Sequence, residues 1–130
     1  MSRVVIGLGS NIDPERYMTA AFDALSKEFV LLSRSGTVRT APVGPQDQPD
    51  YLNAVVLIET GLSREALKSR LKALESSLGR QVRPDKWGPR EIDLDILIWD
   101  GQVINTDYYE RGFLQKAVAE LLADIKRRCC

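Results

Sequence analysis

The chain has 130 residues, of which 44% are hydrophobic and 28% are charged, a size and balance typical of one globular domain. Eighteen basic and eighteen acidic residues cancel, so no overall basic field favours nucleic acid or an anionic membrane surface. No apolar stretch approaches the ~20 residues that span a bilayer, and the N-terminus lacks the pattern of a secretory signal. We therefore expect a single domain over residues 1–130, located in the cytoplasm.

Residue types exclude two further classes of site. The sequence contains no histidine, and its only cysteines are the adjacent Cys129 and Cys130. Histidine-based acid–base chemistry and a zinc site are therefore excluded. The sequence carries no signal for an oligomeric state.

Glycine and proline divide the first half of the chain into strands and helices. Residues 4–8 form a short apolar strand, after which Asp13 and Pro14 provide an N-cap and a first-turn proline for a helix. Residues 30–39 are predicted to form the next strand, and residues 40–50, with three prolines, a stiff loop. The helix buries one apolar stripe, formed by Met18, Ala21, Phe22, Leu25 and Phe29.

The second half contains two further strands, a hairpin and two helices. Residues 51–60 form a strand, and Ser63 caps a helix that ends at Gly79. A loop over residues 80–90 leads into a strand over residues 93–99, and Asp100-Gly101 predicts a hairpin turn with a return strand at 102–104. The helix after Ser63 buries Leu67, Leu71, Leu74 and Leu78, and a last helix over about 111–126 turns Phe113, Val118, Leu121, Leu122 and Ile125 inward.

This order of elements predicts an α+β fold, a ferredoxin-like two-layer sandwich in which helices pack on one side of a mostly antiparallel sheet. The connection between residues 39 and 51 contains no helix, which argues against parallel pairing of the flanking strands. The Gly7-x-Gly9 turn lacks the third glycine and the distant acidic residue of a dinucleotide-binding motif, and no Walker motif occurs. Any phosphate chemistry must therefore use arginines and metal.

Two carboxylates stand at the start of the strand over residues 93–99. Asp93 and Asp95 lie two residues apart, so their side chains point to the same face of the sheet. Like charges side by side repel each other unless a cation lies between them. Magnesium suits such a pair, because it usually takes one or two carboxylates and completes its shell with waters and substrate phosphates. The pair therefore predicts a magnesium site.

A basic loop precedes the carboxylates. It contains Arg80, Arg83, Lys86 and Arg90. Metal and guanidinium groups around a phosphate are the arrangement that phosphoryl transfer uses. Taken alone, the loop is explained equally well as a solvated surface with weak ion pairs. Because the loop leads directly to two carboxylates that need a cation, phosphoryl transfer is the better interpretation of its basic residues.

Several motifs occur together in one known family. They are the run over residues 39–54 (Arg-Thr-Ala-Pro-Val-Gly-Pro-Gln-Asp-Gln-Pro-Asp-Tyr-Leu-Asn-Ala), Gly79-Arg80, Trp87-Gly88-Pro89-Arg90 and Ile92-Asp93-Leu94-Asp95. From residue 4 to about residue 106 the chain resembles 6-hydroxymethyl-7,8-dihydropterin pyrophosphokinase of folate biosynthesis. The resemblance implies a ferredoxin-like sheet, two magnesium ions, and transfer of pyrophosphate from ATP to the hydroxymethyl group of the reduced pterin with release of AMP.

The resemblance also implies roles for individual residues. The metal ligands are Asp93 and Asp95, which with Arg80, Trp87 and Arg90 form the catalytic set. The pterin pocket contains Thr40, Val43 through its backbone, Tyr51, Asn53 and Phe113, and the nucleotide contacts are Glu75, Arg80, Arg83, Arg90, Ile96 and Arg111. On periodicity alone, Tyr51 and Phe113 would be packing residues and Glu75 a solvent-facing acid of its helix.

The chain departs from the family on the nucleotide side. Asp107-Tyr108-Tyr109-Glu110 stand where the family has a longer stretch that helps line the adenosine site and includes a histidine. Lys86 replaces an arginine and so loses the fork geometry of the guanidinium. Three interpretations follow: an active pyrophosphokinase with a shortened nucleotide wall, a non-catalytic module that binds a pterin or a nucleotide, and a plain interaction domain. We favour the first, because the aspartate pair and the arginine loop are both present.

Overall fold

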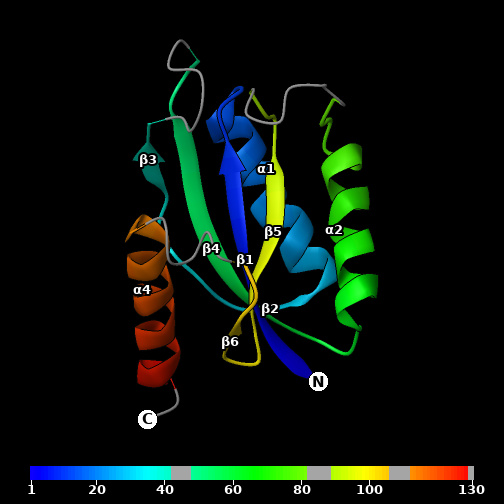
Figure 1. Ribbon diagram of the computed structural model, residues 1–130, viewed down its shortest axis with the longest axis vertical. Helices are drawn as coiled ribbons and strands as arrows, with labels where there is room; N and C mark the ends of the chain where they lie inside the picture. Colours follow the sequence, from blue (N-terminus) through cyan, green and yellow to red (C-terminus); the bar gives the residue numbers. More distant parts are fainter. Residues whose placement is uncertain (42–47, 82–88, 106–111, 129–130) are drawn as a thin grey trace.

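The computed structural model describes residues 1–41, 48–81, 89–105 and 112–128, and within the last range the side chains of residues 112 and 114–121. Helices and strands alternate along the chain (Figure 1). The elements are β1 (Ser2–Ser10), α1 (Pro14–Glu28), β2 (Val30–Arg34), β3 (Val38–Thr40), β4 (Tyr51–Thr60), α2 (Arg64–Ser77), β5 (Asp93–Trp99), β6 (Gln102–Val103) and α4 (Gly112–Arg128).

The described strands form one antiparallel sheet of order β2-β4-β1-β5-β6, with β3 also paired to β4. The central strand β1 pairs along its whole length with β4, from Ser2 opposite Thr60 to Ser10 opposite Leu52. On its other side β1 pairs with β5, from Val4 opposite Trp99 to Gly9 opposite Asp93. The predicted α+β class with a mostly antiparallel sheet is confirmed.

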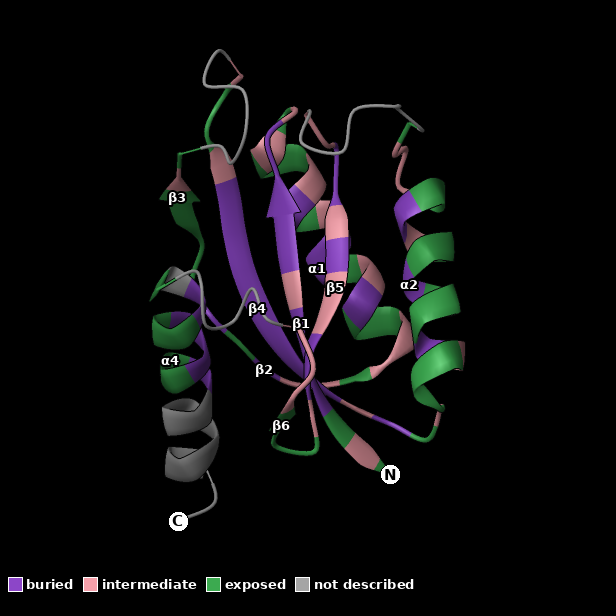
Figure 2. Ribbon diagram, in the orientation of Figure 1, coloured by how far each residue is buried: buried purple, intermediate pink, exposed green. Residues whose placement is uncertain are grey.

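Helices cover both faces of the sheet, so the expectation that they pack on one side of it is wrong for α4. α1 and α2 pack on one face, over a core that includes Ile6 of β1 and Val56 of β4. α4 packs on the opposite face, where Leu121 contacts the cluster that contains Val55 and Leu97. β4 is buried along nearly its whole length, as Figure 2 shows, and its residues are largely apolar on both faces, so each face needs its own helix.

Caps and turns fix the helix ends near the site. Ser63 accepts a hydrogen bond from the backbone N–H of Ala66 at 3.1 Å, as predicted for the N-cap of α2. Asp13 occupies the N-cap of α1 but its side chain makes no capping bond, because its backbone is left-handed (φ 45°) rather than extended as capping requires. Gly79, with φ 108°, ends α2 as predicted.

Three strand details differ from the sequence expectation. The predicted strand over residues 30–39 is divided into β2 and β3, because the Ser35 hydroxyl accepts from the N–H of Val55 at 3.0 Å in place of a strand carbonyl. A register shift in the pairing of β1 with β5 puts Leu97 and Ile98 on the same face. Ile98 is therefore not on the face of Ile96. The return strand is Gln102–Val103.

No helix in the described part of the chain is long and apolar enough to cross a membrane.

Candidate functional site

One half of the sheet face that carries α4 has glycines and polar side chains in place of apolar ones. α4 packs over the half that contains Val5, Leu57 and Ile98. Along β1, Val5 is followed on this face by Gly7 and Gly9, which have no side chains to fill the surface. On either side stand the polar ends of β4 and β5.

The strand register defines two rows of residues across this surface. Gly9 lies opposite Asn53 of β4 and opposite Asp93 of β5, and Gly7 lies opposite Asp95. Since neighbouring strands are about 4.8 Å apart, the backbones of Asn53 and Asp93 are separated by roughly 10 Å. A Cβ at Gly9 would lie 3.4 Å from Oδ1 of Asn53. Without a Cβ at Gly9, only backbone lies between the Asn53 amide and the Asp93 carboxylate; we call this strip the glycine trough.

On one side of the trough the structure brings together three of the residues predicted to bind the pterin. The Asn53 amide donates to Oγ1 of Thr40 at 2.7 Å and to the carbonyl of Val38 at 3.3 Å. These two bonds hold the amide so that its oxygen faces Gly9. Tyr51 lies at the start of β4, and its ring carbon Cδ1 is 3.7 Å from the Cβ position of Gly9. Val43 and the side chain of Phe113 lie outside the described residues.

On the other side of the trough, Arg80 joins two carboxylates. Its Nη1 donates to Oδ1 of Asp93 at 2.9 Å and to Oε1 of Glu75 at 2.6 Å. The backbone supports this position, because the N–H of Gly79 bonds to Ser76 and the N–H of Arg80 to the carbonyl of Glu75, the pattern of a Schellman motif. The chain after α2 thus turns back with its guanidinium aimed at Asp93.

Glu75 is buried, which excludes the solvent-facing alternative. The residue is 2% exposed and continues the buried stripe of α2 that Leu67 and Leu71 begin, at four-residue spacing. Its Oε2 accepts the backbone N–H of Leu94 at 2.7 Å, and its Oε1 also lies 3.4 Å from Nζ of Lys72. The carboxylate is therefore held by donors on both oxygens.

Asn11, which the sequence interpretation did not single out, links the two loops that border the site. Its side-chain nitrogen donates to Oε1 of Gln48 at 2.9 Å and to the carbonyl of Pro49 at 3.1 Å. Its side-chain oxygen accepts from the N–H of Arg90 at 2.8 Å, and its own N–H donates to the carbonyl of Arg90. A polar residue directly after the apolar strand and Gly9-Ser10 was the available signal.

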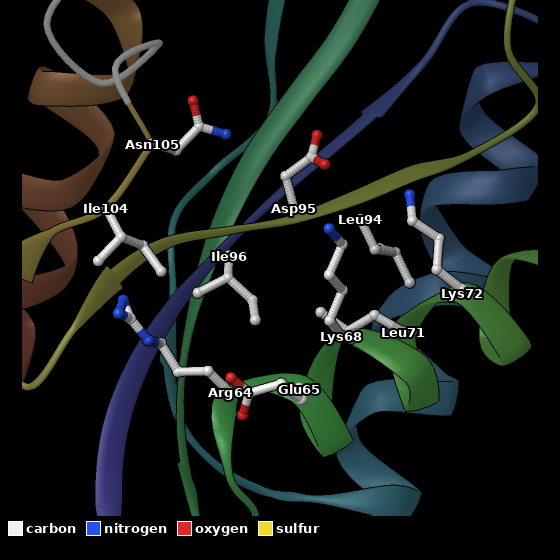
Figure 3. A pocket seen from close by; sticks show the side chains of 10 residues that line it. All are labelled: Arg64, Glu65, Lys68, Leu71, Lys72, Leu94, Asp95, Ile96, Ile104 and Asn105. Carbon is white, nitrogen blue, oxygen red and sulfur yellow. The ribbon is translucent and has the colours of Figure 1, made fainter.

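A cavity of about 580 Å³ lies between α2 and β5 (Figure 3). Its lining residues are Arg64, Glu65, Lys68, Leu71, Lys72, Leu94, Asp95, Ile96, Ile104 and Asn105. Ile96, predicted as a nucleotide contact, lies here together with Asp95. Lys68 and Lys72 extend from α2 toward β5. The basic lining residues Arg64, Lys68 and Lys72 were not predicted, but their spacing of four residues would have revealed one cationic helix face.

The carboxylates fit a magnesium ion better than an all-protein metal cage. Within the described residues no group of three or more potential metal ligands occurs, so a metal ion at Asp93 and Asp95 would have these two carboxylates as its described protein ligands. Magnesium uses such sites together with substrate phosphates. The contact of Arg80 with Asp93 shows that this carboxylate attracts a cation. Arg83, Trp87 and Arg111 lie outside the described residues.

Comparisons with known proteins agree with this geometry. Residues 5–123 match the model of the 7,8-dihydro-6-hydroxymethylpterin-pyrophosphokinase family. A 2-amino-4-hydroxy-6-hydroxymethyldihydropteridine pyrophosphokinase of Haemophilus influenzae is 38% identical over 136 residues, covering 96% of this chain and 84% of that protein. Proteins of the same name from Aquifex aeolicus and Bacillus subtilis are 39% and 35% identical, covering 89% and 94% of this chain and 74% and 79% of their own lengths.

Proposed function

The chain belongs to the 7,8-dihydro-6-hydroxymethylpterin-pyrophosphokinase family, and we propose that it transfers pyrophosphate from ATP to the hydroxymethyl group of the reduced pterin across the glycine trough of its sheet. The observation that carries this proposal is the row Asn53, Gly9 and Asp93 on three adjacent strands. It puts an amide suited to a heterocycle and a carboxylate suited to a metal on one face of the sheet. The cytoplasm, where ATP is available, is the expected location.

The acceptor binds on the β4 side of the trough. Because the amide nitrogen of Asn53 is occupied by Thr40 and Val38, its oxygen is the group that meets the pterin. An amide oxygen can accept from the amino and ring N–H groups of such a heterocycle. The aromatic face of Tyr51 supports a flat ring. Val43 and Phe113, which the family resemblance adds to this pocket, complete the proposed set.

The donor binds on the β5 side, with its triphosphate near Asp93 and Asp95 and its nucleoside in the cavity beside α2. Asp93 and Asp95 would hold magnesium, which when bound neutralises phosphate oxygens and orients them for displacement. Arg80 and Arg90 supply guanidinium groups for the same oxygens. Ile96 lines the nucleoside part of the cavity, and Lys68 and Lys72 add positive charge along its α2 wall.

The reaction needs little covalent chemistry from the protein. The hydroxymethyl oxygen forms a bond to the β-phosphorus, the bond from that phosphorus to the oxygen of the α-phosphate breaks, AMP leaves, and the hydroxyl proton is released. Catalysis then consists of holding the two substrates in line and stabilising phosphate charge. The family resemblance adds Arg83, Trp87 and Arg111 to this side: guanidinium groups would meet phosphate oxygens, and the indole would help exclude water, which would compete as a nucleophile.

The test is to incubate the protein with ATP, magnesium and 6-hydroxymethyl-7,8-dihydropterin and to measure AMP. We expect AMP and the pterin diphosphate in equal amounts, and a loss of about 10²–10³-fold in kcat for Asp95→Asn, which keeps the size of the side chain but removes its charge. Binding of the pterin without any AMP would instead indicate a non-catalytic binding module. ATP hydrolysis without pterin diphosphate would contradict the proposed acceptor side.

A further inference from the structure

Glu75 contacts both the strand and the arginine of the donor site, and we propose that it is a positioning residue for the metal site at Asp93 and Asp95. This inference rests on the proposed function for the identity of the site. It assigns Glu75 a different role from the nucleotide contact that the family resemblance implies. With 2% of the residue exposed and both oxygens occupied, its carboxylate is not available to a substrate.

The first support is the position of Leu94 between the two metal ligands. In the described part of the chain, β6 pairs with β5 at Ile98 and Trp99, whereas at Leu94 the edge of β5 is bonded by a side chain of α2. Glu75 of α2 accepts the Leu94 N–H at this edge, with an N to O distance of 2.7 Å. The Glu75 carboxylate takes the place of a strand carbonyl at Leu94. Because Leu94 lies between the two aspartates, this bond fixes the backbone from which both aspartate side chains project.

The second support is the shared arginine. Nη1 of Arg80 is 2.6 Å from Oε1 of Glu75 and 2.9 Å from Oδ1 of Asp93. The guanidinium is thus held against a carboxylate to which we assign magnesium. In the structure, Arg80 supplies the positive charge beside Asp93. With magnesium held by Asp93 and Asp95, the ion pair with Glu75 would keep the guanidinium in place to contact phosphate oxygens.

The third support is that only a carboxylate satisfies these donors. One oxygen of Glu75 meets the Arg80 guanidinium and the other meets the Leu94 N–H. A glutamine has a single acceptor oxygen, and its NH₂ group would face one of the two donors. The substitution Glu75→Gln therefore keeps the shape of the side chain but forces a buried donor–donor conflict beside the metal site.

The experiment measures binding of Mn²⁺ alone, by the paramagnetic resonance signal of the free ion, to substrate-free protein. We expect Glu75→Gln to weaken Mn²⁺ binding by about tenfold, the lower end of the effect of losing an outer partner of a metal ligand. Arg80→Met should strengthen it roughly threefold or more, because a competing positive charge next to Asp93 is removed. Effects of opposite sign from the two members of one ion pair are not expected of a purely structural pair.

The chain offers a matched control in Glu28 and Arg70, which form an ion pair of the same 2.6 Å length between α1 and α2. Glu28→Gln should leave Mn²⁺ affinity within about twofold, since exposed pairs contribute little and this one is far from the trough. Glu75→Gln should also lower kcat while the KM for the pterin stays constant. A surface substitution that only adds a negative charge should not restore Mn²⁺ binding to the Glu75→Gln variant.

Two results would overturn the inference. One is a folded Glu75→Gln variant with wild-type Mn²⁺ affinity. If that variant does not fold, Arg80→Met decides: tighter Mn²⁺ binding supports the inference, and unchanged or weaker binding overturns it. The proposed function is tested separately, because wild-type AMP formation and loss of Mn²⁺ binding in Asp95→Asn do not depend on Glu75. The wild-type protein can therefore form AMP even if the inference about Glu75 is wrong.

Discussion

The side chain of Asn11 accepts a hydrogen bond of 2.8 Å from the N–H of Arg90, while its amide nitrogen donates to Gln48 and Pro49. One buried amide thus joins the loop that precedes the acceptor residues of β4 to the loop that precedes the aspartates of β5. The two loops are separated by about a third of the chain in sequence, and Asn11 stands between them at the end of β1. Both substrate sides therefore share one structural support.

Mutation can separate the roles of the side-chain oxygen and the side-chain nitrogen of Asn11. Asn11→Asp keeps the acceptor for Arg90 but places an oxygen against the acceptors of Gln48 and Pro49, so we expect the KM for the pterin to rise more than the KM for ATP. Asn11→Ala removes the side-chain bonds to both loops, leaving only the backbone bond from residue 11 to the Arg90 carbonyl, and should raise both KM values. Each change should lower the free energy of unfolding by about 1–3 kcal/mol, the cost of unsatisfied buried groups. Steady-state kinetics and urea unfolding measure these effects; equal KM changes in Asn11→Asp would contradict the separation.

The two glycines of β1 should respond differently to an added methyl group. In Gly9→Ala the Cβ enters the trough beside Asn53, so the KM for the pterin should rise roughly tenfold with the unfolding free energy within about 1 kcal/mol of wild type. In Gly7→Ala the Cβ meets Cδ1 of Leu97 at 3.0 Å, so stability should fall by about 1–2 kcal/mol with the KM nearly constant. Thermal unfolding and kinetics on both variants test this; a stability loss without a KM change at Gly9 would show that the trough does not bind the pterin.

The cationic wall of the cavity should contribute to binding of the donor. Lys68→Gln removes one charge from the lining between α2 and β5, and we expect the Kd for ATP in the presence of magnesium to rise roughly three- to tenfold, with less effect at high salt. Arg70→Gln removes the same charge from the same helix outside the cavity lining and serves as the control. Calorimetry measures both; equal effects of the two variants would mean that only net charge matters.

The shortened segment after Thr106 leads to a prediction about nucleotide selectivity. The alignment with the Haemophilus influenzae protein spans 136 residues, more than the 130 of this chain, so that relative contains residues with no counterpart here. We expect a smaller preference for ATP over other nucleoside triphosphates than in such longer relatives. Competition calorimetry on the two proteins side by side measures it. A stricter preference for ATP in this chain would contradict the expectation.

The sequence predicted those parts of the site that follow from period and spacing. The shared face of Asp93 and Asp95 requires only the alternation of a strand, and the end of α2 requires only Gly79. Glu75 follows Leu67 and Leu71 at four-residue spacing, a signal for the inner face of α2 that the solvent-facing interpretation overlooked. The donors that satisfy its carboxylate could not be predicted, because the Leu94 N–H is a non-local partner. The role of Asn11 depends in the same way on Gln48 and Arg90, which are distant in sequence.

The face of the sheet on which α4 packs could not be predicted from periodicity either. The amphipathic pattern of residues 111–126 indicates a helix with one buried face, and Val118 and Leu121 are buried as predicted. The pattern does not say which face of the sheet receives it. That choice follows from β4, whose Val55 and Leu57 need cover on the face opposite the one that α1 and α2 occupy.

Gly79 gives the sharpest test of how the end of α2 directs Arg80. Its backbone has φ 108°, a left-handed conformation that favours glycine, and the Schellman bonds around it bring Arg80 back beneath Glu75. Gly79→Ala should lower the free energy of unfolding by about 1–2 kcal/mol. Because strain at this residue displaces the guanidinium from Asp93, kcat should fall as well, by roughly tenfold or more.

Gly101 is the matched control for this substitution. It also has positive φ, at 83°, and a Cβ there would meet no atom within 4 Å, but it lies in the turn between β5 and β6. Gly101→Ala should therefore cost about the same stability and leave kcat unchanged. Chemical denaturation and initial rates on both variants separate backbone strain from positioning. If the two variants had equal kcat, the conformation at the end of α2 would not be what positions Arg80. The ion pair with Glu75 would then position the guanidinium alone.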